Sequence, residues 1–369
     1  MQTLLGFLFL LIGAACGGSF GLPSKYVKKD TPWEVLWGPF FLFVTLLLPV
    51  VLGPILVKSF GSVYLGLTVR AVLPVLVFGF LWGLGSMTLG LSFAFIGLSL
   101  AYALNYGAQI ITGSLVPLAL FNPQDITKTH GIVVLAGVAV CLVGVVVAGI
   151  AAMMKEHSQK QAKAAPPAEA DPQDTAPAKK PRMLIGVIVG VISGVLCAAW
   201  AVASGYAGPV KAAAKAAGNS GVGPEWALTC LILWGGVLSA CGYCAFKLTK
   251  NKTWGHLCRP AIVPTLLIAL VMAVLHDAAV LCFALGWGRL GSLGVPVGYP
   301  AFMSFAIIVG NLHGFRTGEW KGASRKSIQW ILAAIVILIL GVAVLAQGNA
   351  MAERAKAKAA PAVELPTSP

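Results

Sequence analysis

Residues 71–124 read AVLPVLVFGFLWGLGSMTLGLSFAFIGLSLAYALNYGAQIITGSLVPLALFNPQ and contain no charged side chain. A helix needs about 20 apolar residues to cross the hydrocarbon core of a bilayer. The run is therefore too long for one span, and it predicts two spans, 71–92 and 96–119, joined by a tight turn near Gly97. This stretch indicates a chain that passes through a membrane more than once.

The composition of the whole chain supports a membrane protein. Of its 369 residues, 58% are hydrophobic and only 10% are charged, whereas a soluble domain carries about 25% charged residues. The net charge of +14 is carried by lysines and arginines in short segments between apolar runs. Such charges are typical of cytoplasmic loops that set membrane topology, so they do not indicate nucleic-acid binding. The predicted class is a polytopic protein whose surroundings are the lipid bilayer.

Apolar runs along the chain predict an all-α integral membrane protein with ten transmembrane helices. The expected spans are 3–22, 35–57, 71–92, 96–119, 131–153, 183–206, 226–246, 261–286, 294–314 and 328–347. Lys and Arg are more numerous in the loops after odd-numbered spans. Because positive charge favours the cytoplasmic side, we expect those loops in the cytoplasm and both termini outside.

A central segment divides the spans into two groups of five. Residues 155–182 are rich in Ala, Pro, Lys and acids, which predicts a flexible linker; residues 348–369 are expected to form a disordered tail. The halves, 1–154 and 183–347, are weakly alike: SLAYALNY (99–106) resembles SLGVPVGY (292–299). An odd number of spans per copy predicts two inverted five-helix repeats, as in many secondary transporters.

One acid interrupts the eighth span. Asp277 is the only Asp, Glu, Lys or Arg between Pro260 and Gly288. A charged Asp at a helix centre costs about 2.5–3.5 kcal/mol on insertion scales, a cost that protonation removes. We therefore predict Asp277 as a proton-coupling residue, with a structural hydrogen bond or a pair with a neighbouring helix as the alternative. His276 is expected to point elsewhere, because adjacent helix residues do not share a face; His313 is a second proton-coupling candidate.

The fourth span carries a polar stripe. Its members recur at spacings of three and four residues, which places them on one helix face: Tyr102, Asn105, Tyr106 and Gln109. Amides and phenols donate and accept hydrogen bonds without charge, so they suit sugar hydroxyls; hydrogen bonding between helices is the alternative. The predicted substrate-binding set also includes Tyr299 and Asn311 in the ninth span and Trp82 in the third.

Tryptophans fall into two groups by depth. Trp33 and Trp37 lie near the start of a predicted span, where indole favours the membrane interface. Trp82 and Trp200 lie deeper, and one or two of the deep tryptophans could form a stacking face for a sugar ring. Most are expected to serve packing.

Other classes of site are absent from the sequence. No glycine-rich stretch has a Walker or dinucleotide-binding context, which excludes a self-contained ATP-driven pump. The Cys241–Cys244 pair lacks a second pair or histidines at zinc spacing, so neither a metal nor another cofactor is expected. No nucleophile–base set appears, and the chain is not expected to be an enzyme.

Three stretches resemble a known family: GLPSKYVKKDTPWEVLW (21–37), LPVLVFGFLWGLGSMTLGLSFAFIGLSLA (73–101) and GEWKGASRKS (318–327). Together with ten spans in two halves, they resemble the L-rhamnose–proton symporter family of the drug/metabolite transporter superfamily. The resemblance implies a ten-helix inverted-repeat fold in the bacterial inner membrane. It also implies uptake of a 6-deoxyhexose, L-rhamnose or a related sugar, driven by the proton gradient.

These observations leave three functions open. The first is a proton-coupled carrier for a small neutral sugar, with the site between the halves and the protein rocking about it. The second is an exporter of amino acids or other small metabolites from the same superfamily. The third is a membrane sensor or assembly protein that transports nothing.

Overall fold

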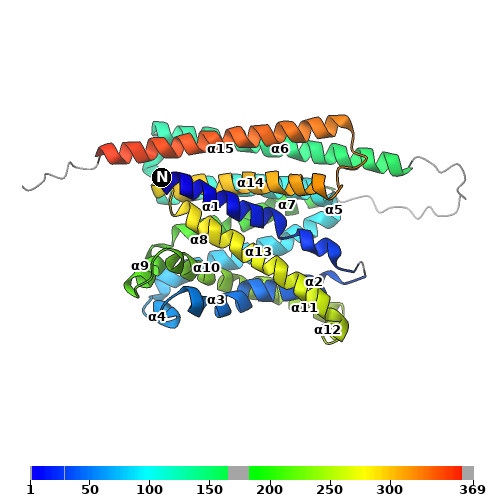
Figure 1. Cartoon of the computed structure of the whole chain (residues 1–369), viewed down its shortest axis with the longest axis horizontal. Helices are drawn as coiled ribbons and strands as arrows, with labels where there is room; N and C mark the ends of the chain where they lie inside the picture. Colours follow the sequence, from blue (N-terminus) through cyan, green and yellow to red (C-terminus); the bar gives the residue numbers. More distant parts are fainter. Residues whose placement is uncertain (1, 29, 165–182, 360–369) are drawn as a thin grey trace, which may run out of the picture.

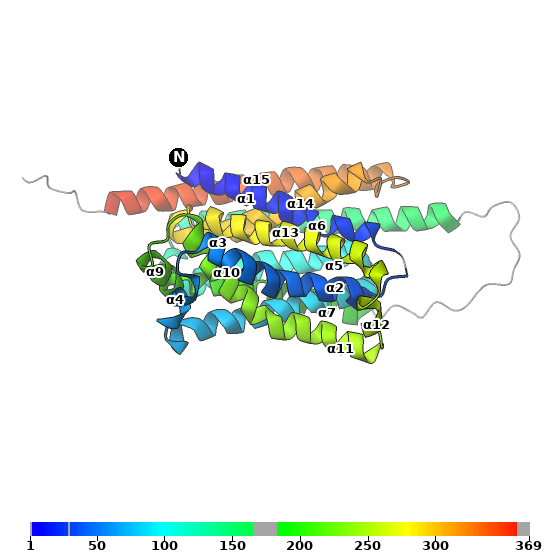
Figure 2. The ribbon, with the colours of Figure 1, turned by 60° about the horizontal axis from the view of Figure 1, so that its bottom comes forward.

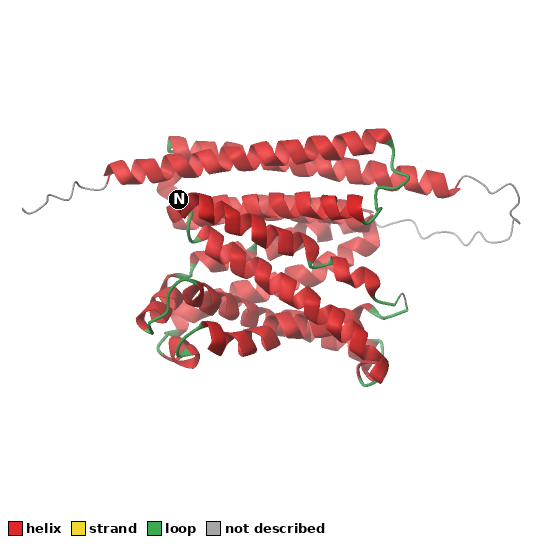
Figure 3. Cartoon of the chain, viewed as in Figure 1, coloured by secondary structure: helices red, strands yellow, loops and turns green. Residues whose placement is uncertain are grey.

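The computed structural model describes residues 2–28, 30–164 and 183–359, and within these ranges every regular element is helical (Figure 3). The first half contains α1 (Gln2–Ser19), η1 (Leu22–Tyr26), α2 (Trp33–Leu42), η2 (Phe43–Leu47), α3 (Leu48–Leu56), α4 (Phe60–Leu65), α5 (Val69–Phe121), η3 (Pro123–Asp125) and α6 (Thr129–Ala164). The second half contains α7 (Met183–Cys197), α8 (Ala199–Gly205), α9 (Gly208–Ala216), α10 (Val222–Gly236), η4 (Val237–Cys241), α11 (Gly242–Lys250), α12 (Trp254–Leu257), η5 (Pro260–Ile262), α13 (Val263–Trp287), η6 (Gly291–Leu293), α14 (Gly294–Arg316) and α15 (Arg325–Ala359).

Ten helical segments within the described ranges are long and apolar enough to cross a membrane, which confirms the predicted fold class. They are Gln2–Tyr26, Trp33–Leu56, Val69–Leu89, Ala101–Phe121, Thr129–Gln159, Leu184–Gly205, Val222–Lys250, Pro260–Trp287, Gly294–Arg316 and Arg325–Lys358. Large apolar side chains point outward from this bundle, such as Leu4, Ile55 and Leu238, which are 77%, 71% and 77% exposed. A bilayer would cover them.

The third and fourth spans are joined differently from the expected tight turn. The backbone of α5 is helical throughout, including at Gly97. Both arms of α5 nevertheless reach the same side chain of α7: Ser193 Oγ donates to the Gly85 carbonyl at 2.8 Å and accepts from Asn105 Nδ2 at 2.8 Å. In a straight helix those two positions would lie about 30 Å apart. α5 therefore bends back sharply, and the predicted pair of spans is connected by helical residues.

Corresponding spans of the two halves are interrupted at corresponding places. The second and seventh spans each contain a π-helical turn, η2 and η4, and the two turns meet where Thr45 Oγ1 lies 3.5 Å from Cys241 Sγ. The first and sixth spans are each broken, between α1 and η1 and at Ala198. Matched interruptions are what a duplicated unit predicts, and the inverted repeat stays a prediction.

Glycines allow the spans to approach closely. A Cβ placed on Gly13 would lie 2.8 Å from the Ala279 carbonyl oxygen of α13. On Gly79 it would lie 2.2 Å from the Ile232 oxygen of α10. Small residues at such contacts let helix backbones touch, so glycine at these positions serves the packing of the spans.

The helices α6 and α15 form an outer layer and extend beyond the other helices at opposite ends (Figures 1 and 2). α6 continues to Ala164 and α15 to Ala359, so both helices run into segments expected to be linker and tail. Ala, Lys, Gln and Glu have high helix propensity, which explains why these polar segments prolong the helices. The rest of the predicted linker, 165–182, and of the tail, 360–369, lies outside the described residues.

Candidate functional site

A cavity of about 180 Å³ lies among the first, second, third, fourth, sixth, eighth and ninth spans. We call it the inner cavity; its wall includes Trp37, Trp82, Gln109, His276, Phe283 and Tyr299. Six of the seven predicted substrate-binding residues line it: Trp82, Tyr102, Asn105, Tyr106, Gln109 and Tyr299. The four residues of the polar stripe thus share the face of the fourth span that borders the inner cavity, and their role in substrate binding stays a prediction.

A larger cavity of about 940 Å³ adjoins the inner cavity; we call it the vestibule. Its wall includes Lys25, Lys155, Gln159, Asn311, His313 and Glu319. The two cavities share five lining residues, which mark the passage between them: Gly17, Phe20, Tyr102, Tyr106 and Ala306. The vestibule lies where the first, fifth and ninth spans end, on the side of the loops that follow odd-numbered spans.

A chain of hydrogen bonds crosses the wall of the inner cavity. Tyr299 Oη donates to Gln109 Oε1 at 2.8 Å, and Gln109 Nε2 donates to Asn105 Oδ1 at 2.5 Å. Asn105 Nδ2 donates to Ser193 Oγ at 2.8 Å, and Ser193 donates in turn to the Gly85 carbonyl. Because each group donates to the next in one direction, the bonds polarise one another and strengthen. These hydrogen bonds connect α14, both arms of α5 and α7 in one wall.

These hydrogen bonds leave both a donor and an acceptor at the wall of the inner cavity. The Tyr299 oxygen has donated its only proton and retains lone pairs, and Gln109 Nε2 carries a second hydrogen beside the one it gives to Asn105. Both hydrogens of Asn105 Nδ2 have partners, Ser193 Oγ and Cys197 Sγ. No Asp, Glu, Lys or Arg lines the inner cavity within the described part of the chain. The wall can therefore meet hydroxyl groups, which donate and accept, without contributing a formal charge.

Aromatic rings form the opposite wall. Trp33 and Trp37 stack with ring centroids 5.9 Å apart, and both line the inner cavity together with Phe40 and Phe41. The interface position expected for the two tryptophans is therefore incomplete: they also face the interior. Trp37, Phe40 and Phe41 follow Trp33 by four, seven and eight residues, a spacing that places all four on one helix face. The sequence already contained this signal. Trp82 and Trp200, 5.2 Å apart, continue this wall.

Asp277 lies behind the cavity wall. Its residue is 2% exposed and does not line either cavity. Its Oδ1 lies 3.1 Å from His276 Nδ1, and its Oδ2 is buried without a hydrogen-bond partner. The expectation that His276 points elsewhere is wrong. Successive helix residues differ by about 100° in direction, and these two side chains lean toward each other across that angle.

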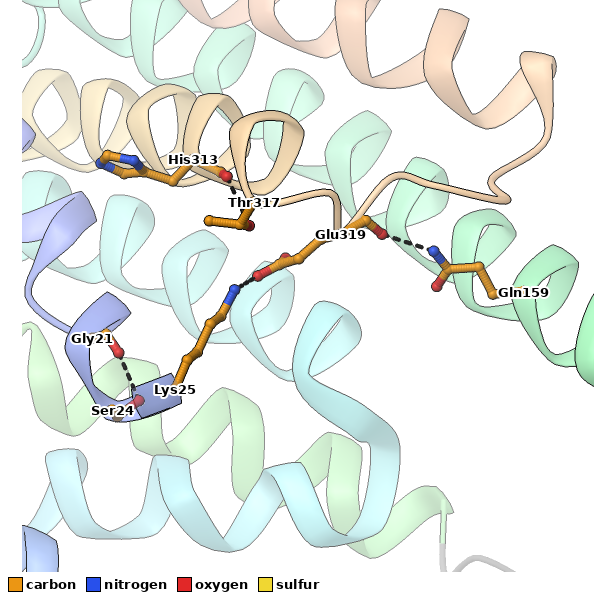
Figure 4. A network of polar contacts seen from close by, with 7 residues as sticks. All are labelled: Gly21, Ser24, Lys25, Gln159, His313, Thr317 and Glu319. Atoms are coloured by element: carbon orange, nitrogen blue, oxygen red, sulfur yellow. Dashed lines mark hydrogen bonds and ion pairs between the residues drawn. The ribbon is translucent and has the colours of Figure 1, made fainter. Parts of the chain in front are cut away.

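The rim of the vestibule is held by polar contacts between segments far apart in sequence (Figure 4). Lys25, at the end of the first span, forms an ion pair with Glu319, which follows the ninth. Gln159 Nε2, on the extension of α6, donates to the carbonyls of Glu319 and Lys321 at 2.7 and 2.9 Å. The rim thus links the ends of three spans around the wide opening.

The two remaining predicted residues belong to the vestibule. Asn311 lines it and donates its amide to the Ile307 carbonyl of its own helix at 2.9 Å. His313 Nε2 lies 2.7 Å from Ser19 Oγ of α1. Both residues therefore stand on the path to the inner cavity and not in its wall.

An ion pair lies near the opposite ends of the spans. Lys211 Nζ, on α9, contacts Glu225 Oε1 of α10 at 2.5 Å and lies 4.0 Å above the ring of Trp287 at the end of α13. Both charged side chains are mostly buried. Burial lowers the pKa of Lys211, and the carboxylate of Glu225 opposes that shift. The Lys211–Glu225 ion pair stabilises the packing of α9 against α10.

Among the described residues, no group of three or more His, Cys, Asp or Glu side chains could hold a metal ion. The cavity chemistry consists of hydrogen bonding, ring faces and one imidazole–carboxyl pair. That combination can recognise a small polar molecule and hold a proton.

Comparisons with known proteins agree over nearly the whole chain. A sequence model of the family described as L-rhamnose-proton symport protein (RhaT) matches residues 1–352. The chain is 26% identical over 353 residues to the L-rhamnose-proton symporter of Escherichia coli (strain SMS-3-5 / SECEC), covering 94% of this chain and 98% of that protein. The identity is also 26% to the same-named protein of Cronobacter sakazakii (strain ATCC BAA-894), over 353 residues with the same coverage.

The L-rhamnose-proton symporter of Yersinia pestis (strain Pestoides F) is 25% identical over 354 residues, again with 94% of this chain and 98% of the relative covered. The match includes the first nine spans, most of the tenth and the polar stripe of the fourth. The proteins of this family are transporters and not enzymes. The chain belongs to the L-rhamnose-proton symport protein family.

Proposed function

We propose that the chain is a secondary carrier that imports a small neutral sugar, L-rhamnose or a related 6-deoxyhexose, by proton symport across the bacterial inner membrane. The names of its relatives support this substrate and this coupling ion. The single observation that carries the proposal is the inner cavity, whose described wall combines uncharged hydrogen-bonding groups with aromatic rings and lacks formal charges.

The wall favours a neutral sugar over an amino acid. A zwitterion would bring two charges that find no oppositely charged side chain, and burying an unpaired ion costs several kcal/mol. Sugar hydroxyls, in contrast, match the second N–H group of Gln109 and the oxygen of Tyr299. The ring faces of Trp37 and Trp82 suit the C–H face of a pyranose, and the 6-methyl group suits an apolar surface.

The shape of the cavities supports transport by alternating access. The vestibule opens on the side that the distribution of Lys and Arg predicts to be cytoplasmic. The sugar would leave through the passage at Tyr102 and Tyr106. Rocking of the two halves about the inner cavity would then open the other side. Asp277 would carry the coupled proton, and His313 would stand on the aqueous route by which that proton leaves.

The test is counterflow in proteoliposomes that contain the purified protein. Vesicles loaded with unlabelled L-rhamnose should take up radiolabelled L-rhamnose against the concentration gradient of the label. External L-fucose should compete with this uptake. Vesicles loaded with leucine, serine or lysine should show no exchange of the same amino acid. Exchange of an amino acid without exchange of either deoxyhexose would replace the proposal with the exporter. Absence of exchange for every solute would favour a protein that transports nothing.

A further inference from the structure

Asp277 has no direct route to either cavity. The carboxyl lines neither cavity, and its one hydrogen bond runs to His276. The second oxygen is buried and has no partner. A proton that reaches Asp277 from the aqueous vestibule must therefore pass through a group that touches both the carboxyl and the cavity.

His276 is that group. It lines the inner cavity, and its ring lies within a box of aromatic rings, with centroid distances of 5.7 Å to Phe20, 6.0 Å to Phe40 and 5.7 Å to Trp82. These rings hold the imidazole with Nδ1 toward Asp277. The opposite nitrogen, Nε2, makes no hydrogen bond within the described residues, so it is available to a molecule in the cavity.

Few other ionisable groups surround this pair. Cys230 of α10 lies near Asp277, and Tyr64 lies against Cys230 while its hydroxyl donates to the Ala227 carbonyl. Over the described ranges, no Lys, Arg or Glu forms an ion pair with His276 or Asp277. A change in the charge of the Asp277 carboxyl therefore acts mainly on the His276 imidazole.

We propose that His276 relays the coupled proton to Asp277 and reports the charge of that carboxyl to the sugar. With Asp277 ionised, Nδ1–H donates to Oδ1 and Nε2 is an acceptor. A hydronium ion in the cavity gives a proton to Nε2 and becomes water, and the Nδ1 proton moves to Oδ1. The O–H bond of the hydronium ion and the Nδ1–H bond break, while the Nε2–H and Oδ1–H bonds form. The carboxyl is then neutral, donates to Nδ1, and Nε2–H has become a donor.

This switch couples the two substrates; the inference rests on the sugar–proton symport proposed above. Protonation of Asp277 changes the hydrogen bond that the cavity offers at Nε2 from accepting to donating. A sugar oxygen that accepts from Nε2–H is bound better by the protonated pair. Because coupling between two ligands is reciprocal, sugar binding must then favour protonation to the same degree.

His130 and Asp125 provide a matched control. This second imidazole–carboxyl pair also has an N–O distance of 3.1 Å, but neither residue lines the inner cavity or the vestibule. His130→Gln should therefore remove a similar pair without affecting coupling. His276→Gln places an amide where the imidazole was. The amide can form hydrogen bonds, but it cannot take up a proton on one side and release one on the other.

The experiment compares counterflow, which needs no net proton movement, with uptake driven by a pH gradient. A gradient of one pH unit can drive accumulation of about tenfold for one coupled proton. We expect wild type and His130→Gln to accumulate L-rhamnose. His276→Gln loses the hydrogen bond at Nε2, so its counterflow should need a higher concentration of L-rhamnose. Its accumulation ratio should fall to about one even at saturating sugar, and its affinity for L-rhamnose should no longer depend on pH.

His276→Asn, which keeps a hydrogen-bonding atom near the position of Nδ1, serves if His276→Gln does not reach the membrane. Gradient-driven accumulation and wild-type pH dependence in either variant would overturn the inference while leaving the proposed function intact. Absence of L-rhamnose counterflow by the wild-type protein would overturn the proposed function, and the inference with it.

Discussion

The hydroxyl of Tyr299 offers a narrow perturbation of the cavity wall. Tyr299→Phe removes one oxygen and leaves the ring, which packs edge-on against Phe283 at a centroid distance of 5.6 Å. The residue is only 3% exposed, so the variant creates little new surface. Its direct effect is on Gln109, whose Oε1 loses the 2.8 Å hydrogen bond that orients the amide.

The loss of sugar affinity in Tyr299→Phe can be estimated from the surroundings of Gln109 Oε1. In the empty variant, water in the cavity can reach Gln109 Oε1, but a bound sugar displaces the water. A buried acceptor without a partner costs about 1–3 kcal/mol. Since about 1.4 kcal/mol equals a factor of ten, the half-saturating concentration of sugar should rise by about 5- to 150-fold.

Counterflow of L-rhamnose at a series of concentrations measures this value in wild type and Tyr299→Phe. Tyr206→Phe is the control, because the ring of Tyr206 stacks on Phe78 at 5.9 Å and lines neither cavity. The control should change the half-saturating concentration less than twofold. A Tyr299→Phe protein that is present at normal levels and has the wild-type half-saturating concentration would refute the role of the hydrogen-bonded wall.

Three further outcomes are expected. Lys211→Met should lower the thermal stability of the purified protein by about 3–5 kcal/mol, because it leaves Glu225 buried without its partner; adding Glu225→Gln should recover part of the loss, and no recovery would contradict the pairing. Burial raises the pKa of Asp125, but hydrogen bonds from Lys128 and His130 outweigh burial and hold the pKa below its usual 3.8. Asp125 thus stabilises the fold above pH 3.8 and loses this effect as pH falls through its lower folded pKa, so the stability deficit of Asp125→Asn, measured by thermal unfolding, should shrink in acid. L-Mannose, which adds a hydroxyl where L-rhamnose has a methyl group, should compete about 5- to 150-fold more weakly in counterflow if that hydroxyl is buried without a partner; equal competition would contradict an apolar subsite.

The sequence was sufficient to predict the spans and the helix face that lines one wall of the inner cavity. Apolar runs of membrane length determine spans with little help from tertiary contacts. The polar stripe from Tyr102 to Gln109 was found because a helix repeats its faces every three and four residues. The aromatic stripe from Trp33 to Phe41 follows the same rule, but tryptophans near a span end also fit the membrane interface, and only the packing shows that they face inward.

The sequence was not sufficient to predict contacts that depend on how helices bend. The pairing of His276 with Asp277 requires two neighbouring side chains to lean together, which helix geometry allows but does not require. The return of α5 on itself brings Gly85 and Asn105 to one side chain of α7, although the residues between them are helical. The helix ends at Ala164 and Ala359 were missed because Ala- and Lys-rich segments suit both helices and linkers.

The central claim is that a neutral sugar and a proton cross the membrane together, with Asp277 holding the proton. It is tested most directly by adding L-rhamnose to weakly buffered proteoliposomes and recording the external pH. The wild-type protein should make the outside more alkaline when the sugar enters, and Asp277→Asn should bind and exchange the sugar without any pH change. Sugar entry without alkalinisation in the wild type, or unchanged alkalinisation in Asp277→Asn, would contradict the account.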